Sequence, residues 1–112
     1  MTDSDTGEHV AQVLEYPSRD GLAVQAFRVD YEPGGFSHVH RHPAGAYVYV
    51  MEGSVEFGVG GDEPVVLKAG DSFYEPPGAL HTISRNASEE TPASFIAFFV
   101  LDNGEIPTVE GM

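Results

Sequence analysis

Glycine and proline recur along the whole chain at short intervals, and this spacing limits the length of every regular element. Turn-forming groups occur at residues 33–35, 52–54, 60–62, 69–71 and 76–78. The segments between them are rich in Val, Ile, Phe and Tyr, the residues that favour strands. No segment combines a helical period of apolar residues with capping residues at its ends. The sequence therefore predicts an all-β protein with little or no helix.

Eight short segments have the composition of strands. They are residues 10–16, 22–31, 47–51, 55–59, 65–67, 72–75, 81–85 and 95–101. In one of them Val55, Phe57 and Val59 alternate with polar or small residues, the two-residue period of a strand with one solvated face. Many short strands in 112 residues are typical of one sandwich or small barrel. We expect this single domain over 10–112, after a flexible acidic segment at 1–9.

The charge and composition exclude several classes of function. Eighteen acidic residues against five Lys and Arg give a formal net charge of −13, which repels nucleic acids and anionic lipid surfaces. The absence of cysteine excludes disulfides, thiolate metal sites and cysteine nucleophiles. The acidic opening residues lack the pattern of a signal peptide, and the longest apolar run, 95–101, is too short to cross a bilayer. We expect a cytoplasmic protein that binds neither nucleic acid nor membrane.

Three of the five histidines lie close together, at His38, His40 and His42. On a strand, alternate residues share one face, with Cα atoms about 6.5 Å apart. Two imidazoles at this spacing can both reach one metal ion at about 2 Å. The alternative is an exposed edge strand whose histidines bond to water. A third imidazole on the same strand lies further from a shared centre, so His40 and His42 are stronger ligand candidates than His38.

Two patterns around these histidines resemble the two motifs of the cupin superfamily. The first motif is a glycine, five residues, His-x-His, three or four residues, a glutamate, six residues and a glycine. The second is a glycine, five residues, Pro-x-Gly, two residues, His, three residues and Asn. The matching positions are Gly34, His40, His42 and Gly53 for the first, and Gly70, Pro76, Gly78 and His81 for the second. The final asparagine comes one position late, at Asn86.

This resemblance implies an antiparallel jelly-roll β-barrel of the small single-domain cupin type over 10–112. It also implies that His40, His42 and His81 converge inside one end of the barrel and bind one divalent transition metal per chain. The sequence departs from the first motif at Ala46, which stands where the motif has its glutamate when the count runs back from Gly53. The four-residue spacing gives Tyr47 instead, which is not a carboxylate either. Without that carboxylate a divalent ion keeps its full charge, which makes it a stronger Lewis acid and favours anionic ligands.

Glu75 stands directly before Pro76, where cupins usually carry an apolar residue. Glu75 and His81 flank the short connection 76–80. If the flanking strands pair as a hairpin, the two Cβ atoms lie about 5 Å apart on one face. We therefore expect Glu75 to point inward, where it could replace the missing ligand, accept a hydrogen bond from an imidazole, or act as a general base. The alternative is a solvated glutamate on the outer face.

The resemblance leads to three functional hypotheses. The first is a mononuclear enzyme with a three-histidine site, an Fe(II) dioxygenase that acts on a small organic substrate, with Glu75 as a catalytic residue. The second is an isomerase, cyclase or dehydratase that uses Zn, Mn or Ni, and the third is a small-molecule-binding cupin without catalysis. Imidazoles bind Fe, Ni, Cu and Zn alike, so the ligands do not select the metal. Apolar strands at 22–31 and 95–101 also suggest a homodimer.

Overall fold

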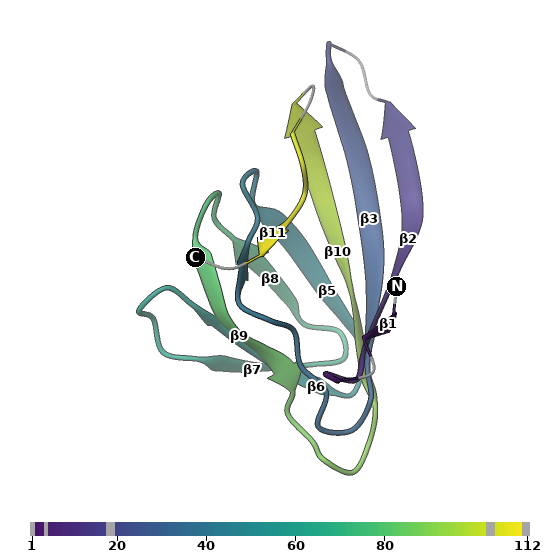
Figure 1. Cartoon of the computed structure of the whole chain (residues 1–112), viewed down its shortest axis with the longest axis vertical. Coiled ribbons are helices and arrows are strands. Elements are labelled where there is room, and N and C mark those ends of the chain that lie inside the picture. Colours follow the sequence, from purple (N-terminus) through teal and green to yellow (C-terminus); the bar gives the residue numbers. More distant parts are fainter. Residues whose placement is uncertain (1, 4, 18–19, 103–104, 111–112) are drawn as a thin grey trace.

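The computed structural model describes residues 2–3, 5–17, 20–102 and 105–110, which form two antiparallel sheets that face each other (Figure 1). The six-stranded sheet has the order β1-β2-β3-β10-β5-β8, and the five-stranded sheet has the order β11-β4-β9-β6-β7. The strands are β1 (Thr2–Asp3), β2 (Glu8–Pro17), β3 (Leu22–Tyr31), β4 (His40–Arg41), β5 (Ala46–Glu52), β6 (Ser54–Val59), β7 (Val65–Lys68), β8 (Ser72–Glu75), β9 (Leu80–Asn86), β10 (Ala93–Asp102) and β11 (Val109–Glu110). The described residues contain no helix, and hence no helical membrane span.

The predicted all-β jelly roll is confirmed, and each of the eight predicted strands is present with ends that differ by at most two residues. The short strands β1, β4 and β11 were not predicted, because two residues show no periodicity. One detail of the barrel differs from the expectation. Within the described part of the chain the two sheets share no strand, so they form two facing layers and not one continuously hydrogen-bonded barrel.

The apolar core lies between the two sheets and is built from alternate residues of the strands. Its largest members come from β3, β5, β6 and β10, and they are Val29, Tyr31, Val48, Val50, Val55, Phe57, Phe95, Phe99 and Leu101. Phe57 of the five-stranded sheet meets Phe95 of the six-stranded sheet edge to face, with ring centroids 5.3 Å apart. Burial of one such side chain contributes about 1.5–3 kcal/mol. The two-residue period of the strands therefore determines which residues join the sheets.

The strands predicted to carry excess apolar surface, β3 and β10, are neighbours in the six-stranded sheet. They pair from Leu22 opposite Asp102 to Tyr31 opposite Ala93. Beside them, β2 begins at Glu8, inside the segment 1–9 that was expected to be flexible. Residues 1 and 4 of that segment lie outside the described residues. Much of the apolar surface of β3 and β10 is thus used within the chain itself.

One motif glycine is required by the path of the chain between the two sheets. Gly53 joins β5 to β6 with a φ of +71°, a conformation that favours glycine. A Cβ at this position would lie 2.5 Å from the carbonyl oxygen of Pro92, closer than such contacts allow. The turn at Gly53 lets the chain pass from the six-stranded sheet to the five-stranded sheet, and so places the strands that carry the site opposite each other.

Candidate metal centre

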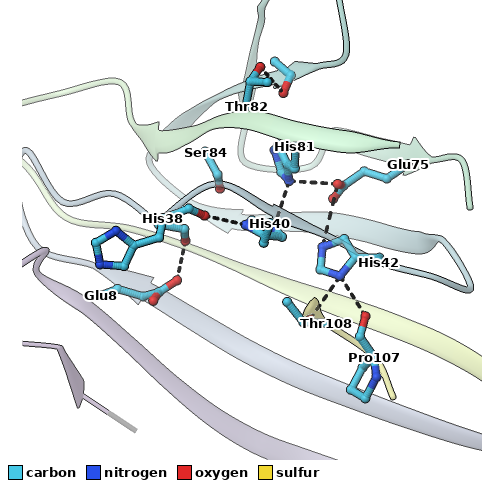
Figure 2. Close-up of polar contacts among 12 residues, drawn as sticks. Glu8, His38, His40, His42, Glu75, His81, Thr82, Ser84, Pro107 and Thr108 are labelled. Atoms are coloured by element: carbon cyan, nitrogen blue, oxygen red, sulfur yellow. Dashed lines mark hydrogen bonds and ion pairs between the residues drawn. The ribbon is translucent and has the colours of Figure 1, made fainter. Parts of the chain in front are cut away.

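Three histidines and one glutamate converge between the sheets (Figure 2). His40 lies on β4, His42 directly after it, His81 on β9 and Glu75 at the end of β8. One nitrogen or oxygen atom of each side chain lies within 4.8 Å of the others, and all four residues are buried. The structure therefore brings together the three histidines of the two motifs and adds Glu75 to them.

His40 and His42 are both oriented by backbone carbonyls. His40 Nδ1 lies 2.7 Å from His38 O, and His42 Nδ1 lies 3.0 Å from Pro107 O. A carbonyl oxygen only accepts hydrogen bonds, so in both rings Nδ1 carries the hydrogen and Nε2 carries a lone pair. Contacts of this kind fix the tautomer and the orientation of a metal-binding imidazole. Both rings are thus prepared to bind a cation through Nε2.

His81 approaches from β9, the strand that pairs with β4, and its Cα lies opposite that of His40. Its Nδ1 lies 3.1 Å from His40 Nε2, and its ring contacts Phe57 edge to face at a centroid distance of 4.9 Å. The pairing of β9 with β6 shifts register beside His81. The shift allows His81 and Ser84, three positions apart on one strand, both to be buried.

Glu75 enters the site from the sheet opposite His81. Its Oε1 lies 2.8 Å from His81 Nδ1 and 3.7 Å from His42 Nε2. The predicted inward orientation of Glu75 is confirmed, but the predicted hairpin of β8 with β9 is wrong. β8 pairs with β5, whereas β9 pairs with β4 and β6, so the connection between them crosses from one sheet to the other. Glu75 and His81 therefore meet across the interior.

Ala46 and Glu75 are direct partners in the ladder between β5 and β8. Both are buried, with 0% of Ala46 and 3% of Glu75 exposed. Directly paired residues of antiparallel strands lie on one face with Cβ atoms about 4.5–5.5 Å apart. The carboxylate that the first motif places on β5 is thus absent from β5, and the neighbouring strand presents one from the same face of the sheet.

The four side chains have the spacing of ligands around one divalent ion. Adjacent donors at about 2.1 Å from an octahedral ion lie about 3 Å apart. The distances from His81 Nδ1 to Glu75 Oε1 and to His40 Nε2 are 2.8 and 3.1 Å. Among the described residues neither Glu75 Oε1 nor His81 Nε2 has a well-aligned hydrogen-bond partner, although Glu75 Oε1 lies 2.8 Å from His81 Nδ1. A buried unpaired oxygen costs about 1–3 kcal/mol, which a bound cation would offset.

Electrostatics favour the neutral form of His40 and of His42 and the ionised form of Glu75. Burial lowers the pKa of His40 to about 4, although its contact with the His38 carbonyl acts in the opposite direction. Burial also lowers the pKa of His42. For Glu75, burial alone would raise the pKa, but the contact with His81 and the charge interactions with the surrounding histidines together lower it. Metal binding requires this combination of neutral imidazole and ionised carboxylate.

A cavity of about 670 Å³ adjoins the four residues. Its apolar wall is formed by Val10, Phe27, Val29, Phe95, Ala97 and Phe99. His38 also lines the cavity but does not belong to the group of four. A cavity of this size, mostly apolar with a few polar groups, is typical of a small-molecule site.

The chain after β10 contacts the site, although its sequence suggested no role. Pro107 O and Thr108 Oγ1 lie 3.0 and 3.1 Å from His42 Nδ1. Both contacts are drawn in Figure 2. The short strand β11 pairs with β4 and holds this segment in place.

A second polar group in the cavity was also missed by the sequence analysis. Tyr31 Oη lies 2.6 Å from Ser84 Oγ and also bonds to Ser37, which in turn donates a hydrogen bond to Glu8. Glu8, Ser37 and Ser84 line the cavity. These four residues, the Glu8 cluster, come from distant parts of the chain and show no common motif. Their proximity depends on the register of β2, β3 and β9.

Comparison with known proteins agrees with this architecture. The family described as "Cupin domain" matches residues 27–99. Germin-like protein subfamily 2 member 1 of Arabidopsis thaliana is 35% identical over 107 residues, which cover 91% of this chain and 47% of the relative. Oxalate oxidase GF-3.8 of Triticum aestivum is 33% identical over 105 residues, with coverage of 87% and 45%. The chain spans about half the length of the curated relatives it matches.

Solved structures show the same fold. An oxalate oxidase in complex with the substrate analogue glycolate has a TM-score of 0.79 at 27% identity, and the match covers 98% of this chain and 58% of that one. A cupin-like protein from Thermotoga maritima has a TM-score of 0.75 at 25% identity, with coverage of 97% and 81%. The family match includes His40, His42, Glu75 and His81 and extends over more than half of the sequence. The chain therefore belongs to the cupin family.

Proposed function

We propose that this protein is a metal-dependent oxidoreductase that acts on a small organic molecule in the cavity beside the four buried residues. The observation that carries the proposal is the set of three imidazoles and one carboxylate, whose ligand atoms lie within 4.8 Å of one another. Burying an ionised carboxylate costs several kcal/mol unless a cation lies beside it. A divalent ion bound by these residues would be that cation and would offset the cost of burying the Glu75 carboxylate.

We propose Glu75 as the fourth metal ligand, beside His40, His42 and His81. If a divalent ion bound to these four residues, one carboxylate and three neutral imidazoles would leave it a net charge of +1. Bound there, a redox-active ion supplies Lewis acidity and a one-electron couple. Fe(II) and Mn(II) suit a ligand set that mixes nitrogen and oxygen donors. Zn, Ni and Cu also bind to imidazole and carboxylate, but they do not favour the oxygen donor.

The surrounding protein orients these ligands and excludes water. The carbonyls of His38 and Pro107 hold two of the imidazole rings. Phe99 contacts His42 with tilted rings at a centroid distance of 5.0 Å, and Phe57 contacts His81 edge to face at 4.9 Å. Aromatic walls lower the local dielectric constant and so strengthen every charge interaction with a bound substrate.

The relatives support the class of reaction and not a particular substrate. The wheat relative at 33% identity and the solved structure at 27% identity are both named oxalate oxidase. A third relative, at 34% identity, is named rhicadhesin receptor. Its name favours a second candidate function, ligand binding without turnover.

The metal content of the purified protein tests the proposal. Elemental analysis should find about one divalent ion per chain in protein prepared without a histidine tag. Glu75→Gln should bind the ion about 10–100-fold more weakly. Glu63→Gln is the matched control, because Glu63 is exposed in the turn between β6 and β7 and loses the same charge. Wild-type protein that takes up no ion on loading with Fe(II) or Mn(II) would contradict the metal site.

Oxygen uptake then separates the two candidate functions. Iron- or manganese-loaded protein should consume oxygen in the presence of a substrate from a panel of small organic acids, amines and alcohols. A ligand that binds to the loaded protein without any oxygen uptake or product would favour the binding protein.

We also propose a homodimer. The outer face of the six-stranded sheet exposes a group of large side chains, Tyr16, Tyr47, Tyr49, Tyr74 and Val100. Closed two-fold dimers are the commonest soluble assembly, and an apolar sheet face of this kind suits one. Light scattering at physiological salt should give twice the 12.0 kDa chain mass. A monomeric mass would refute the dimer without affecting the metal site.

A further inference from the structure

The apolar wall of the cavity is a continuous surface made by three neighbouring strands. Val29 of β3 is paired with Val10 of β2 on one side and with Phe95 of β10 on the other. Two residues along β3, Phe27 is paired with Ala97 of β10. All five residues line the cavity. Directly paired residues lie on one face with Cβ atoms about 4.5–5.5 Å apart, so these side chains form two adjacent apolar rows.

The apolar wall reaches the metal ligands through Phe99. This residue lies two positions beyond Ala97 on β10 and also lines the cavity. Its ring meets that of Phe27 edge to face at a centroid distance of 5.8 Å, and it contacts the ring of His42 at 5.0 Å. A ligand group bound to an ion at His42 would therefore lie at the edge of the apolar wall.

The apolar wall offers a ligand both contact area and length. Phe27 belongs to the interior of the domain and yet is only partly buried, because it faces the cavity. Neighbouring strands lie about 4.8 Å apart, so the wall extends about 10 Å from β10 to β2. Each CH₂ group that a ligand buries against such a surface tightens binding by up to about fourfold.

The proposed ion determines the charge of the other end of the ligand. With Glu75 as its only carboxylate, a divalent ion would keep a net charge of +1. One anionic oxygen donor neutralises that charge. A second anionic group placed against the apolar wall would lose its hydration without replacement, which is costly.

We infer that the ligand of this site is an amphipathic monoanion, in which one metal-binding group such as a carboxylate is joined to an apolar alkyl or aryl body that lies on the apolar wall. The inference rests on the proposed function for the anionic end and on the wall for the body. Ala97 has the smallest of the six side chains in the wall, so it determines how large a body fits. Oxalate, the compound in the names of two relatives, consists of two carboxylates and has no apolar body.

Calorimetric titration of Mn(II)-loaded protein with acetate, butanoate and hexanoate tests this ligand class. The three compounds share one carboxylate and differ only in the length of the apolar body. We expect each added CH₂ group to tighten binding about two- to fourfold, so that hexanoate binds at least about fifteenfold more tightly than acetate. Equal affinities for acetate and hexanoate in protein that has bound its ion would overturn the inference, and this comparison requires no substitution.

Ala97→Phe tests whether the effect of chain length arises at the apolar wall. The added ring takes up space in the cavity, so the advantage of hexanoate over acetate should fall to about threefold or less, with unchanged metal content. Ala11→Phe is the matched control, because Ala11 is exposed on β2 and does not line the cavity. A folded Ala97→Phe protein that keeps the wild-type advantage would overturn the inference.

1-Hexanol separates this inference from the metal site, because it carries the apolar body without the anionic group. Metal-free wild-type protein should bind 1-hexanol at least about tenfold more tightly than ethanol, and Ala97→Phe should remove this difference. The same difference in a protein that takes up no ion would refute the proposed function alone, because the apolar wall would still select the ligand. In Mn(II)-loaded protein, 1-hexanol that binds as tightly as hexanoate would overturn the anionic end of the inference.

Discussion

The two polar ends of the cavity differ in the direction in which their hydrogen bonds run. At the metal end, the Nδ1 hydrogens of His40 and His42 point outward to backbone carbonyls, so that lone pairs converge inward. At the Glu8 end, Ser37 donates its hydroxyl hydrogen to the Glu8 carboxylate, and Tyr31 Oη bonds to the hydroxyls of Ser37 and Ser84 and to the Ser84 carbonyl. The first arrangement suits a metal ion, and the second holds one carboxylate in place. The direction of the hydrogen bonds therefore distinguishes the two ends as clearly as the residue types do.

Removing a ligand from the metal end should have the largest effect. His42→Ala should lose most of the bound metal, as measured by elemental analysis. A ligand at 1,000 times its dissociation constant stabilises the folded state by about 4 kcal/mol. A chelator should thus lower the free energy of unfolding of the loaded wild type by this amount and leave His42→Ala unchanged. His9→Ala, which alters an exposed pair with Glu32, is the control. Equal metal content in all three proteins would show that the histidines do not bind it.

Acid should destabilise the metal-free protein, because His40 at the metal end is buried in its neutral form. The pKa of His40 is lowered from 6.5 to about 4 in the folded state. Between these values the unfolded chain binds a proton that the folded chain does not, so stability is lost as the pH falls from 6.5 toward 4. The loss amounts to up to about 3 kcal/mol. Urea unfolding with chelator present should show this decline and little change between pH 7 and 8. A flat profile from pH 7 to 4 would contradict the burial of a neutral imidazole.

Moving the carboxylate from β8 to β5 should show whether the two strand positions are equivalent for metal binding. Glu75→Ala should weaken metal binding about 10–100-fold. Because Ala46 is the direct partner of Glu75 and faces the same interior, Ala46→Glu in the Glu75→Ala background should recover most of the affinity. Competition with a metal-binding dye measures both constants. Ala46→Glu that fails to improve a folded Glu75→Ala protein would show that the two positions are not equivalent.

The smallest effect is expected at the Glu8 end. Tyr31→Phe removes one hydroxyl from the chain that orients Glu8 and leaves two serines without that partner. We expect a loss of about 1–2 kcal/mol in the free energy of unfolding, with unchanged metal content. Tyr49→Phe, on the exposed outer face of the six-stranded sheet, should have no measurable effect on either quantity. A loss of metal in Tyr31→Phe would mean that the two ends are not independent.

The sequence contains the information for the strands and for most of the metal end. Glycine and proline mark the turns, and alternation within 55–59 identifies the buried face. The spacing of His40 and His42 places them on one side of an extended segment, and the motif connects them with His81. These features are local or belong to a known pattern, so they can be recognised without knowledge of which strands pair.

The remaining features depend on strand pairing, which the sequence does not display. The inward orientation of Glu75 was predicted from a hairpin that does not exist, because β8 and β9 belong to opposite sheets. The equivalence of Glu75 with Ala46 follows only from the register between β5 and β8. The Glu8 cluster likewise joins residues from four separate segments, and neither its serines nor Tyr31 belong to a motif.

The contact between His42 and Pro107 has a consequence for the order of events during synthesis. The two residues are 65 positions apart, and Pro107 follows both motifs in the chain. A growing polypeptide therefore contains the metal-binding histidines long before it contains the carbonyl that orients one of them. Contacts between residues so distant in sequence form late, because the intervening chain must first be ordered. We expect the nascent domain to acquire its ion only after residues 105–110 have been made and have docked on β4.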